Sequence, residues 1–313
     1  MILTLTPNPA LDLTYHLRTL DVGASRRVPP AQQRAGGKGI NVARVLHAQG
    51  HATHVVAPVG GGTGALVRAD LESSGLPHVL LETGLETRRT LALVTPTATT
   101  NLNESGLALT AEQWDRLTEL TAAALGPGGA TSILVCSGSM PPDAPPEAIA
   151  RIVEVAHARG ARCLVDTSSA PHLLAAAAAG ADVLKPNHHE LLAVTGGTDV
   201  LAAARDLAQR GGSVVYASLG AAGLLRVPVE GDVLHARPSR SLSGNTTGAG
   251  DAAVAAIAAS LATGSGTEDT LRLATAWSGA AVLHPLAGSI TDPAPLLAEV
   301  TIDTVTATPA LED

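Results

Sequence analysis

Short apolar runs alternate with segments of helical periodicity along most of the chain. The runs are rich in β-branched residues and end in turn residues, which is typical of buried strands. Segments with apolar residues at helical spacing separate them, including 38–49, 64–74, about 247–263 and 267–283. This alternation predicts an α/β fold in which helices flank a mostly parallel central sheet. The predicted strands are "THVVAPV", "SILVCSG", "RCLVDTS", "DVLKPN" and "SVVYASLG".

Two segments, about 11–35 and 87–107, depart from this pattern. Their runs "LDLTYHL" and "TLALVTP" alternate apolar and polar residues, as half-exposed strands do. We expect them to pair into a small β-sheet lid over the functional site. Because no long linker divides the chain, a single domain over 1–313 is predicted, with a peripheral tail from residue 303.

Composition excludes several classes of function. With a net charge of −8 and 45% hydrophobic residues, the chain is typical of a compact enzyme and offers no overall positive field to nucleic acid. It contains no Phe, two Trp and two Tyr, too few for an evident base-stacking surface. Cys136 and Cys163 lie in apolar runs, which favours reduced thiols. Without a signal peptide or a membrane-length apolar run, a soluble cytoplasmic protein is expected, with no membrane partner.

The stretch "GNTTGAGDAA" at 244–253 places glycines at the start of an alanine-rich helix. Gly248 and Gly250 allow backbone N–H groups to converge where a helix carries partial positive charge, which favours phosphate. Asp251 falls in the first turn, where its carboxylate could face a substrate hydroxyl. An ordinary helix N-cap explains the same pattern about equally well.

Lysine usage marks two further junctions. The chain has two lysines, Lys38 and Lys185, against eighteen arginines. Lys38 lies in the glycine-rich "RAGGKGIN" and Lys185 begins "KPNHHE", both at predicted strand-to-helix junctions. A solvated lysine is the ordinary explanation, but a compact ammonium can approach phosphate where a planar guanidinium cannot.

After Lys185, Asn187 and Glu190 share one helix face at i,i+3 spacing and suit a hydrated Mg²⁺. His188 and His189 are neighbours that point apart on a helix, so we interpret them as exposed structural residues and not as zinc ligands.

Other strand ends add candidates to the same edge of the sheet. "SLGAAG", from Ser218 to Gly223, allows close approach to a nucleotide, and a tight turn explains the same glycines equally well. Ser139 and Asp166 also follow strands, and ligands of open α/β sheets bind at the carboxyl ends of strands.

A competing motif, "GGGTGA" at 60–65, follows a strand, and an acidic residue, Glu82, lies about 20 residues further along the chain. It matches a dinucleotide fingerprint and supports a nicotinamide enzyme. It leaves the other glycine-rich junctions unexplained, so a structural turn is preferred.

Together, "GGKGIN", "CSGSMP", "KPNHHE", "SLGAAG" and "NTTGAGDA", in this order, resemble the ribokinase-like sugar kinases. The opening "LTPNPALDLTYHL" narrows the resemblance to the phosphofructokinase-B branch, and the similarity runs from residue 2 to about 295. The resemblance implies a ribokinase-like fold, ATP and Mg²⁺ as cofactors, and a homodimer formed through the lid.

The resemblance also implies a role for each matching residue. Asp251 is the expected catalytic base, and the backbone of Gly248, Ala249 and Gly250 the anion hole. The expected sugar-phosphate ligands are Asp12, Gly37, Lys38, Asn41, Arg88 and Ser139; those at the nucleotide end are Asn187, Ser218, Gly220, Gly223 and Thr247, with Asn187 and Glu190 for the metal.

The chain departs from the branch where Arg88-Arg89-Thr90 replaces Arg-hydrophobic-Asn and Ala92 replaces a basic residue. These changes touch the sugar-phosphate end, so the exact substrate stays open. The expected activity is ATP-dependent conversion of fructose 1-phosphate to fructose 1,6-bisphosphate, with tagatose-6-phosphate or 6-phosphofructokinase activity as alternatives. Two alternatives from other functional classes stay open, an NAD-dependent oxidoreductase and a non-catalytic sugar-phosphate-binding protein. Sugar-phosphate binding alone would not need Asp251.

Overall fold

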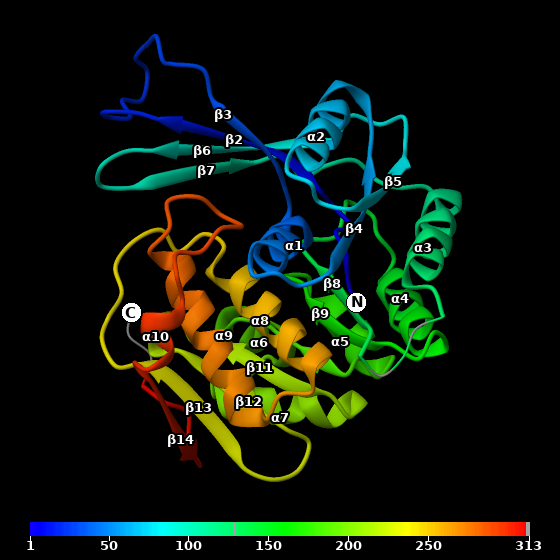
Figure 1. The fold of residues 1–313 in the computed structure, drawn as a ribbon, viewed down its shortest axis with the longest axis vertical. Coiled ribbons are helices and arrows are strands. Elements are labelled where there is room, and N and C mark those ends of the chain that lie inside the picture. The colour runs from blue at the N-terminus through cyan, green and yellow to red at the C-terminus, as the bar shows by residue number, and fades with distance from the viewer. Residues whose placement is uncertain (128, 130, 311–313) are drawn as a thin grey trace.

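The computed structural model describes residues 1–127, 129 and 131–310, which form a large sheet and a small sheet. The strands of the large sheet are β1 (Ile2–Leu5), β4 (Thr53–Val59), β5 (His78–Glu82), β8 (Ile133–Ser137), β9 (Arg162–Asp166), β10 (Val183–Leu184), β11 (Val214–Ser218), β12 (Leu224–Val227), β13 (Val233–Pro238) and β14 (Val300–Val305). Their order is β14-β13-β12-β11-β10-β9-β8-β1-β4-β5 (Figure 1). The pairs from β5 to β11 are parallel and those from β11 to β14 are antiparallel. The mostly parallel sheet predicted from the apolar runs is confirmed.

Helices cover both faces of this sheet (Figure 1). One layer consists of α1 (Lys38–Ala48), α8 (Ala249–Thr263) and α9 (Thr267–Val282), which share an apolar core with the sheet. The other consists of α3 (Ala111–Leu125), α4 (Pro146–Ala158), α5 (Ala170–Ala178), α6 (His188–Thr195) and α7 (Val200–Gly211). Helix α8 is buried along Asp251–Ser260, and its alanines allow α1 and α9 to pack closely against it.

The small sheet contains β2 (Ala10–His16), β3 (Gln32–Gly36), β6 (Arg88–Val94) and β7 (Thr99–Asn103), in the order β3-β2-β6-β7. These strands come from the two segments that the alternating pattern singled out. Figure 1 shows the small sheet above the ends of α8 and α9, next to α2 (Gly61–Ser73). The chain enters it four residues after β1 ends, so the small sheet lies at the carboxyl end of the large sheet.

The elements differ from the sequence-based expectations mainly at one helix start and at one edge of the large sheet. The helix predicted over 64–74 begins at Gly61, because a carboxylate from a neighbouring loop binds its first amides. The hairpin β12–β13 was not predicted. The tail from residue 303, expected to be peripheral, includes the end of β14, which pairs with β13 as the edge strand of the sheet. The short helix α10 (Ala294–Leu297) precedes that strand. In the described part of the chain, no helix combines the length and the apolar character needed to cross a membrane.

Candidate active site

A cavity of about 980 Å³ opens at the carboxyl ends of the central strands, beneath the small sheet. The structure brings every residue predicted for the site to its lining. From the sugar-phosphate set it includes Asp12, Gly37, Lys38, Asn41, Arg88 and Ser139; from the nucleotide and metal sets Asn187, Glu190, Ser218, Gly220, Gly223 and Thr247; and from the start of α8 Gly248, Ala249, Gly250 and Asp251.

The start of α8 faces the cavity without a capping side chain. Its N-cap, Gly248, has φ 90°, a left-handed conformation that disfavours other residues. A Cβ there would also lie 3.1 Å from Ala287 Cα, so the turn is closely backed by another loop. The first amides of the helix and its dipole can therefore act on an anion in the cavity.

Asp251 lies in the first turn of this helix and is buried. Asn41 Nδ2 donates a hydrogen bond of 2.9 Å to Asp251 Oδ2. Burial raises the pKa of Asp251 to about 6, although the nearby Lys38 ammonium acts in the opposite direction. A carboxylate with a pKa near neutrality is suited to accept a proton from a hydroxyl group.

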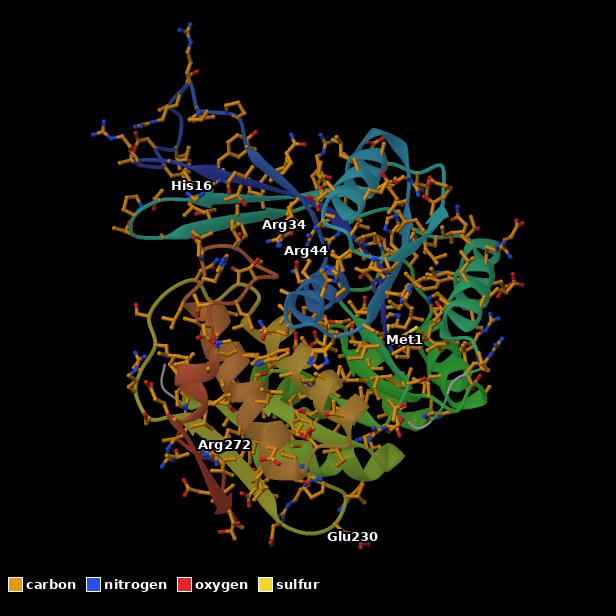
Figure 2. All side chains as sticks on the ribbon, viewed as in Figure 1. Met1, His16, Arg34, Arg44, Glu230 and Arg272 are labelled. Atoms are coloured by element: carbon orange, nitrogen blue, oxygen red, sulfur yellow. The ribbon has the colours of Figure 1, made fainter. Side chains whose placement is uncertain are left out.

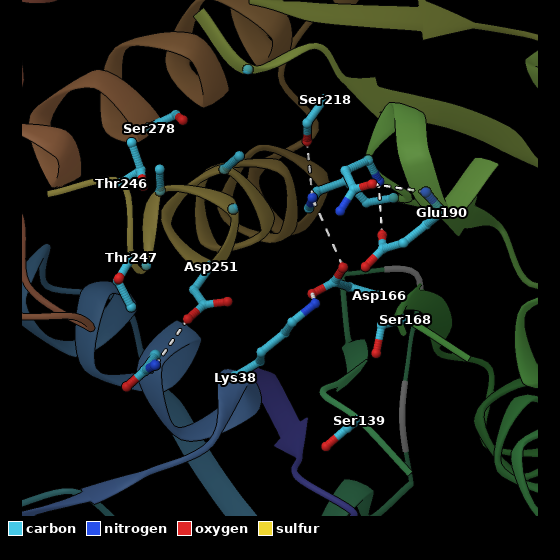
Figure 3. Close-up of a pocket in the computed structure, with 18 of the residues that line it drawn as sticks. Lys38, Ser139, Asp166, Ser168, Glu190, Ser218, Thr246, Thr247, Asp251 and Ser278 are labelled. Carbon is cyan, nitrogen blue, oxygen red and sulfur yellow. Dashed lines mark hydrogen bonds and ion pairs between the residues drawn. The ribbon is translucent and has the colours of Figure 1, made fainter. Parts of the chain in front are cut away.

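Both lysines of the chain converge on Asp166, at the end of β9 (Figure 3). Lys38 Nζ lies 3.4 Å from Asp166 Oδ2 and Lys185 Nζ lies 3.8 Å from Oδ1. Burial alone would raise the pKa of Asp166, but the two ammonium groups outweigh it and hold the pKa below its usual value. Asp166 in turn raises the pKa of Lys38, which stays a cation. Lys185 also donates to Ser218 Oγ at 3.1 Å.

Asn187 and Glu190 form a capping box at the start of α6. Asn187 Oδ1 accepts from the Glu190 amide and Glu190 Oε2 accepts from the Asn187 amide, each at 2.8 Å. Their i,i+3 spacing therefore has a structural purpose that the sequence interpretation did not include.

The same region fits a hydrated Mg²⁺ held mainly by phosphates. Glu190 lines the cavity and uses one carboxylate oxygen in the capping box, and the buried Asp166 Oδ1 has no hydrogen-bond partner among the described residues. Mg²⁺ in such sites takes one or two carboxylates and fills its other positions with water and phosphate oxygens. Among the described residues, no cluster of three or more His, Cys, Asp or Glu side chains forms an all-protein metal site.

At the opposite end of the cavity, backbone carbonyls orient Arg88. Its Nε and Nη2 donate to Asn8 O at 3.2 and 3.1 Å, and Nη1 donates to Glu104 O at 2.9 Å. Asn8 Nδ2 in turn lies 3.3 Å from Ser139 Oγ, so Asn8 connects the two predicted residues. A guanidinium held by neutral carbonyls keeps its full charge for an anionic ligand.

Asp12 projects into the cavity from β2. Thr90 Oγ1 donates to Asp12 Oδ1 at 2.5 Å, and burial raises the pKa of this carboxylate. Thr90, which marked a departure from the branch, is thus part of the site and holds the orientation of Asp12.

The end of the cavity beyond Ser218 is a largely apolar slot between α8, α9 and β12. Its apolar walls and small hydroxyl side chains suit a nucleobase. Besides Gly220 and Gly223, it is lined by Ala221, Leu224, Pro238, Leu242, Thr246, Ala253, Ala274, Thr275, Ser278, Gly279 and Val282.

The "GGGTGA" turn lies outside this cavity, at the start of α2. The Glu86 carboxylate lies where an anionic ligand would bind at the start of α2. It accepts hydrogen bonds from the amides of Gly62 at 3.2 Å and Thr63 at 2.8 Å. Glu82, the acidic residue of the fingerprint, instead pairs with Arg68 at the surface. The structure therefore supports a structural turn at this motif.

The sequence interpretation did not assign three of the residues that organise the cavity. Asp166 was recognised as a strand end, but its role requires that both lysines reach it. Asn8 and Thr90 depend on contacts between the small sheet and the core. The histidines at the start of α6 differ from expectation, because the partly buried His188 and the exposed His189 both line the cavity.

Residues 6–294 match the model of the pfkB family of carbohydrate kinases. The chain is 37% identical to a 1-phosphofructokinase of Xanthomonas campestris pv. campestris over 88% of this chain and 89% of that protein. It is 32% identical to the ATP-dependent 6-phosphofructokinase isozyme 2 of Escherichia coli over 90% and 93% of the two chains. The structure of Escherichia coli phosphofructokinase-2 in complex with fructose-6-phosphate superposes with a TM-score of 0.85, at 29% identity over 95% of this chain and 98% of that chain.

Proposed function

The chain belongs to the pfkB family of carbohydrate kinases, and from this premise we propose that it transfers the γ-phosphoryl group of ATP to fructose 1-phosphate, forming fructose 1,6-bisphosphate. The observation that carries the proposal is the placement of Asp251. A buried carboxylate with a pKa of about 6 shares its helix turn with an uncapped helix N-terminus, inside a cavity that has fixed cations toward both ends.

The chemistry follows from that placement. Asp251 accepts the proton of the C6 hydroxyl as the oxygen–phosphorus bond forms and the bond to the β-phosphate oxygen breaks, releasing ADP. The amides of Gly248–Gly250 and the Lys38 ammonium face the developing negative charge. Thr247, Ser218, Gly220 and Gly223 line the nucleotide side.

Lys38 and Lys185 share Asp166, and this arrangement suits phosphate recognition. Because one buried carboxylate holds both ammonium groups, they are preorganised before substrate arrives. A Mg²⁺ ion bound near Glu190 and Asp166 would neutralise phosphate charge there. Asn187 contributes mainly by capping α6, since its side-chain oxygen already accepts a hydrogen bond.

The phosphate already present on the sugar is assigned to Arg88, with Ser139 and Asn8 beside it. Asp12, oriented by Thr90, is assigned to the sugar hydroxyls. Fructose 6-phosphate is the second candidate, because relatives named 6-phosphofructokinase isozyme 2 match at 32 to 33% identity. Tagatose 6-phosphate remains the third.

The assembly proposed for the enzyme is a homodimer formed through the small sheet. All of β7 is exposed, and the adjoining 17–31 loop carries Val22 fully exposed and Leu20 at 44%. An exposed strand edge with apolar neighbours favours pairing with a second copy. We place the reaction in the cytoplasm, where ATP and sugar phosphates are available.

The test is ADP release with MgATP across fructose 1-phosphate, fructose 6-phosphate, tagatose 6-phosphate, fructose and ribose, with Asp251→Asn as the control. Turnover of one phosphorylated ketohexose that is lost in the variant supports both the reaction and the base. Turnover confined to fructose or ribose would contradict the sugar-phosphate assignment, and saturable NAD(H) binding without any ATP effect would favour the oxidoreductase alternative.

A further inference from the structure

The loop 283–293, between α9 and α10, lies between the small sheet and the start of α8. Arg34 on β3 reaches it from the small sheet, and its Nη1 donates to Ala287 O at 3.0 Å and to Ser289 Oγ at 3.1 Å. Figure 2 shows Arg34 where the small sheet meets the rest of the molecule. Arg34 is not among the residues that line the cavity, so it is not placed to contact substrate.

The opposite side of the same loop contacts the candidate catalytic groups. Ala287 backs Gly248, where an added Cβ would lie 3.1 Å from Ala287 Cα and 3.2 Å from Gly288 N. Gly288 backs Asn41, since a Cβ on Gly288 would lie 2.7 Å from Asn41 Oδ1. Asn41 is the residue that donates to Asp251. A shift of this loop would therefore move both the anion hole and the partner of the base.

On the small sheet, Arg34 is the cross-strand partner of Asp12, the carboxylate assigned to the sugar hydroxyls. Its strand is anchored from behind, because Asp70 accepts the Ala35 amide at 2.9 Å and also pairs with Arg44. The Arg34 guanidinium thus extends from a fixed point of β3, beside the sugar end, to the loop that supports the phosphoryl-transfer end.

We infer that Arg34 is a positioning residue that couples the small sheet to the anion hole, so that sugar bound at Asp12 and phosphoryl transfer at Asp251 are aligned through the 283–293 loop. This inference rests on the proposed kinase function. It assigns to Arg34 an effect on turnover without a contact to either substrate. A misplacement of about 1 Å at the reacting groups costs on the order of 100-fold in rate, so a modest shift of the loop is sufficient.

The experiment compares Arg34→Met, which removes the donors, with Arg34→Lys, which retains one cation able to donate. Arg68→Met is the matched control, because Arg68 lies on α2, which packs against β3, and forms its ion pair with Glu82 at the surface. In Arg34→Met, kcat is expected to fall about 10- to 100-fold while both KM values change far less. Arg34→Lys should recover part of that loss, and Arg68→Met should resemble the wild type.

Hydrogen exchange of the ligand-free protein supplies a readout that needs no substrate. Arg34→Met should exchange faster in peptides covering 284–291 and 245–251, whereas Arg68→Met should not. A higher KM for the sugar phosphate at unchanged kcat would make Arg34 a substrate ligand and overturn the inference. Unchanged exchange in both peptides would also overturn it. If the wild type turns over no sugar phosphate while the exchange difference is present, the proposed function fails and the coupling stands.

Discussion

Helices α2 and α8 both begin at glycine-rich turns, yet only one of them is open to a ligand. At α2, the chain supplies its own anion, because the Glu86 carboxylate binds the amides of Gly62 and Thr63 and the hydroxyl of Thr63. At α8, no side chain caps the first turn, and the turn faces a cavity of about 980 Å³. The two sites differ in what lies in front of the helix, although their sequences look alike.

This difference shows how a glycine-rich helix start should be interpreted. The partial charge of the first amides requires a partner in every helix. A partner that is near in the fold but more than twenty residues away in the chain, such as Glu86, makes the helix start structural. The absence of a capping side chain at α8, together with the buried Asp251 beside it, leaves the amides available for an external anion.

The largest effect is expected when the carboxylate at each helix start is replaced by an amide. Asp251→Asn should lower kcat by about 100- to 10,000-fold, because the amide keeps the size of the side chain but cannot accept the proton. Glu86→Gln should leave kcat unchanged, since Glu86 lies outside the cavity. Steady-state kinetics with MgATP and the preferred sugar phosphate measure both. Comparable losses in the two variants would remove the distinction between the helices.

The second test adds a methyl group to each glycine turn. Gly248→Ala should lower kcat about 100-fold, because φ 90° is strained for alanine and the new Cβ pushes against Ala287. Gly61→Ala, at φ 66°, would overlap the Glu86 carboxylate and should lower the melting temperature without lowering kcat. Kinetics at 25 °C and thermal unfolding of both variants separate these outcomes. A fall in kcat for Gly61→Ala would contradict the structural assignment of α2.

Much of the fold could be predicted because its signals are local. Apolar runs of strand length located β4, β8, β9, β10 and β11, and helical spacing of apolar residues located α1, α2, α8 and α9. The parallel strands β1 and β5 were not among the predicted strands. The strands β12 to β14 were harder, since antiparallel edge strands are partly exposed and their pattern is mixed. The pairing of β14 with β13 joins residues more than sixty positions apart, which no local pattern records.

The site was predictable to the extent that its residues follow strand ends. Ser218 and Asp166 end the parallel strands β11 and β9, and the sheet brings them to one edge. Lys38 instead follows β3 of the small sheet and Asp251 follows the loop after β13, and glycine-rich helix starts marked both. The environment of each group could not be predicted, because it depends on tertiary contacts. The pKa of Asp251 depends on burial and on Lys38, and the pairing of both lysines with Asp166 requires the packed core.

A third prediction uses the environment of Asp251. Because its pKa is about 6 and the base must be ionised, kcat/KM should be level above pH 6 and fall about tenfold per pH unit below it. The folded pKa lies above the ordinary aspartate value of 3.8, so the folded protein binds the proton more tightly than the unfolded chain. The stability that Asp251 contributes is therefore full below pH 3.8 and is lost as the pH rises through about 6. Urea unfolding of wild type and Asp251→Asn between pH 4 and 7.5 measures this loss, and equal pH dependence in the two proteins would contradict it.

The smallest effect is expected for Glu86. Its contribution to stability changes with pH in the opposite direction to that of Asp251. Hydrogen bonds from the Thr63 amide and hydroxyl lower the pKa of Glu86 below the ordinary glutamate value of 4.5. Its contribution to stability is therefore present above pH 4.5 and is lost as the pH falls through the lowered value. Glu86→Gln should melt slightly below the wild type at pH 7.5 and approach it near pH 4. If Glu86→Gln instead equals the wild type at both pH values, the capping carboxylate contributes nothing to α2, and the contrast with α8 would depend on the cavity alone.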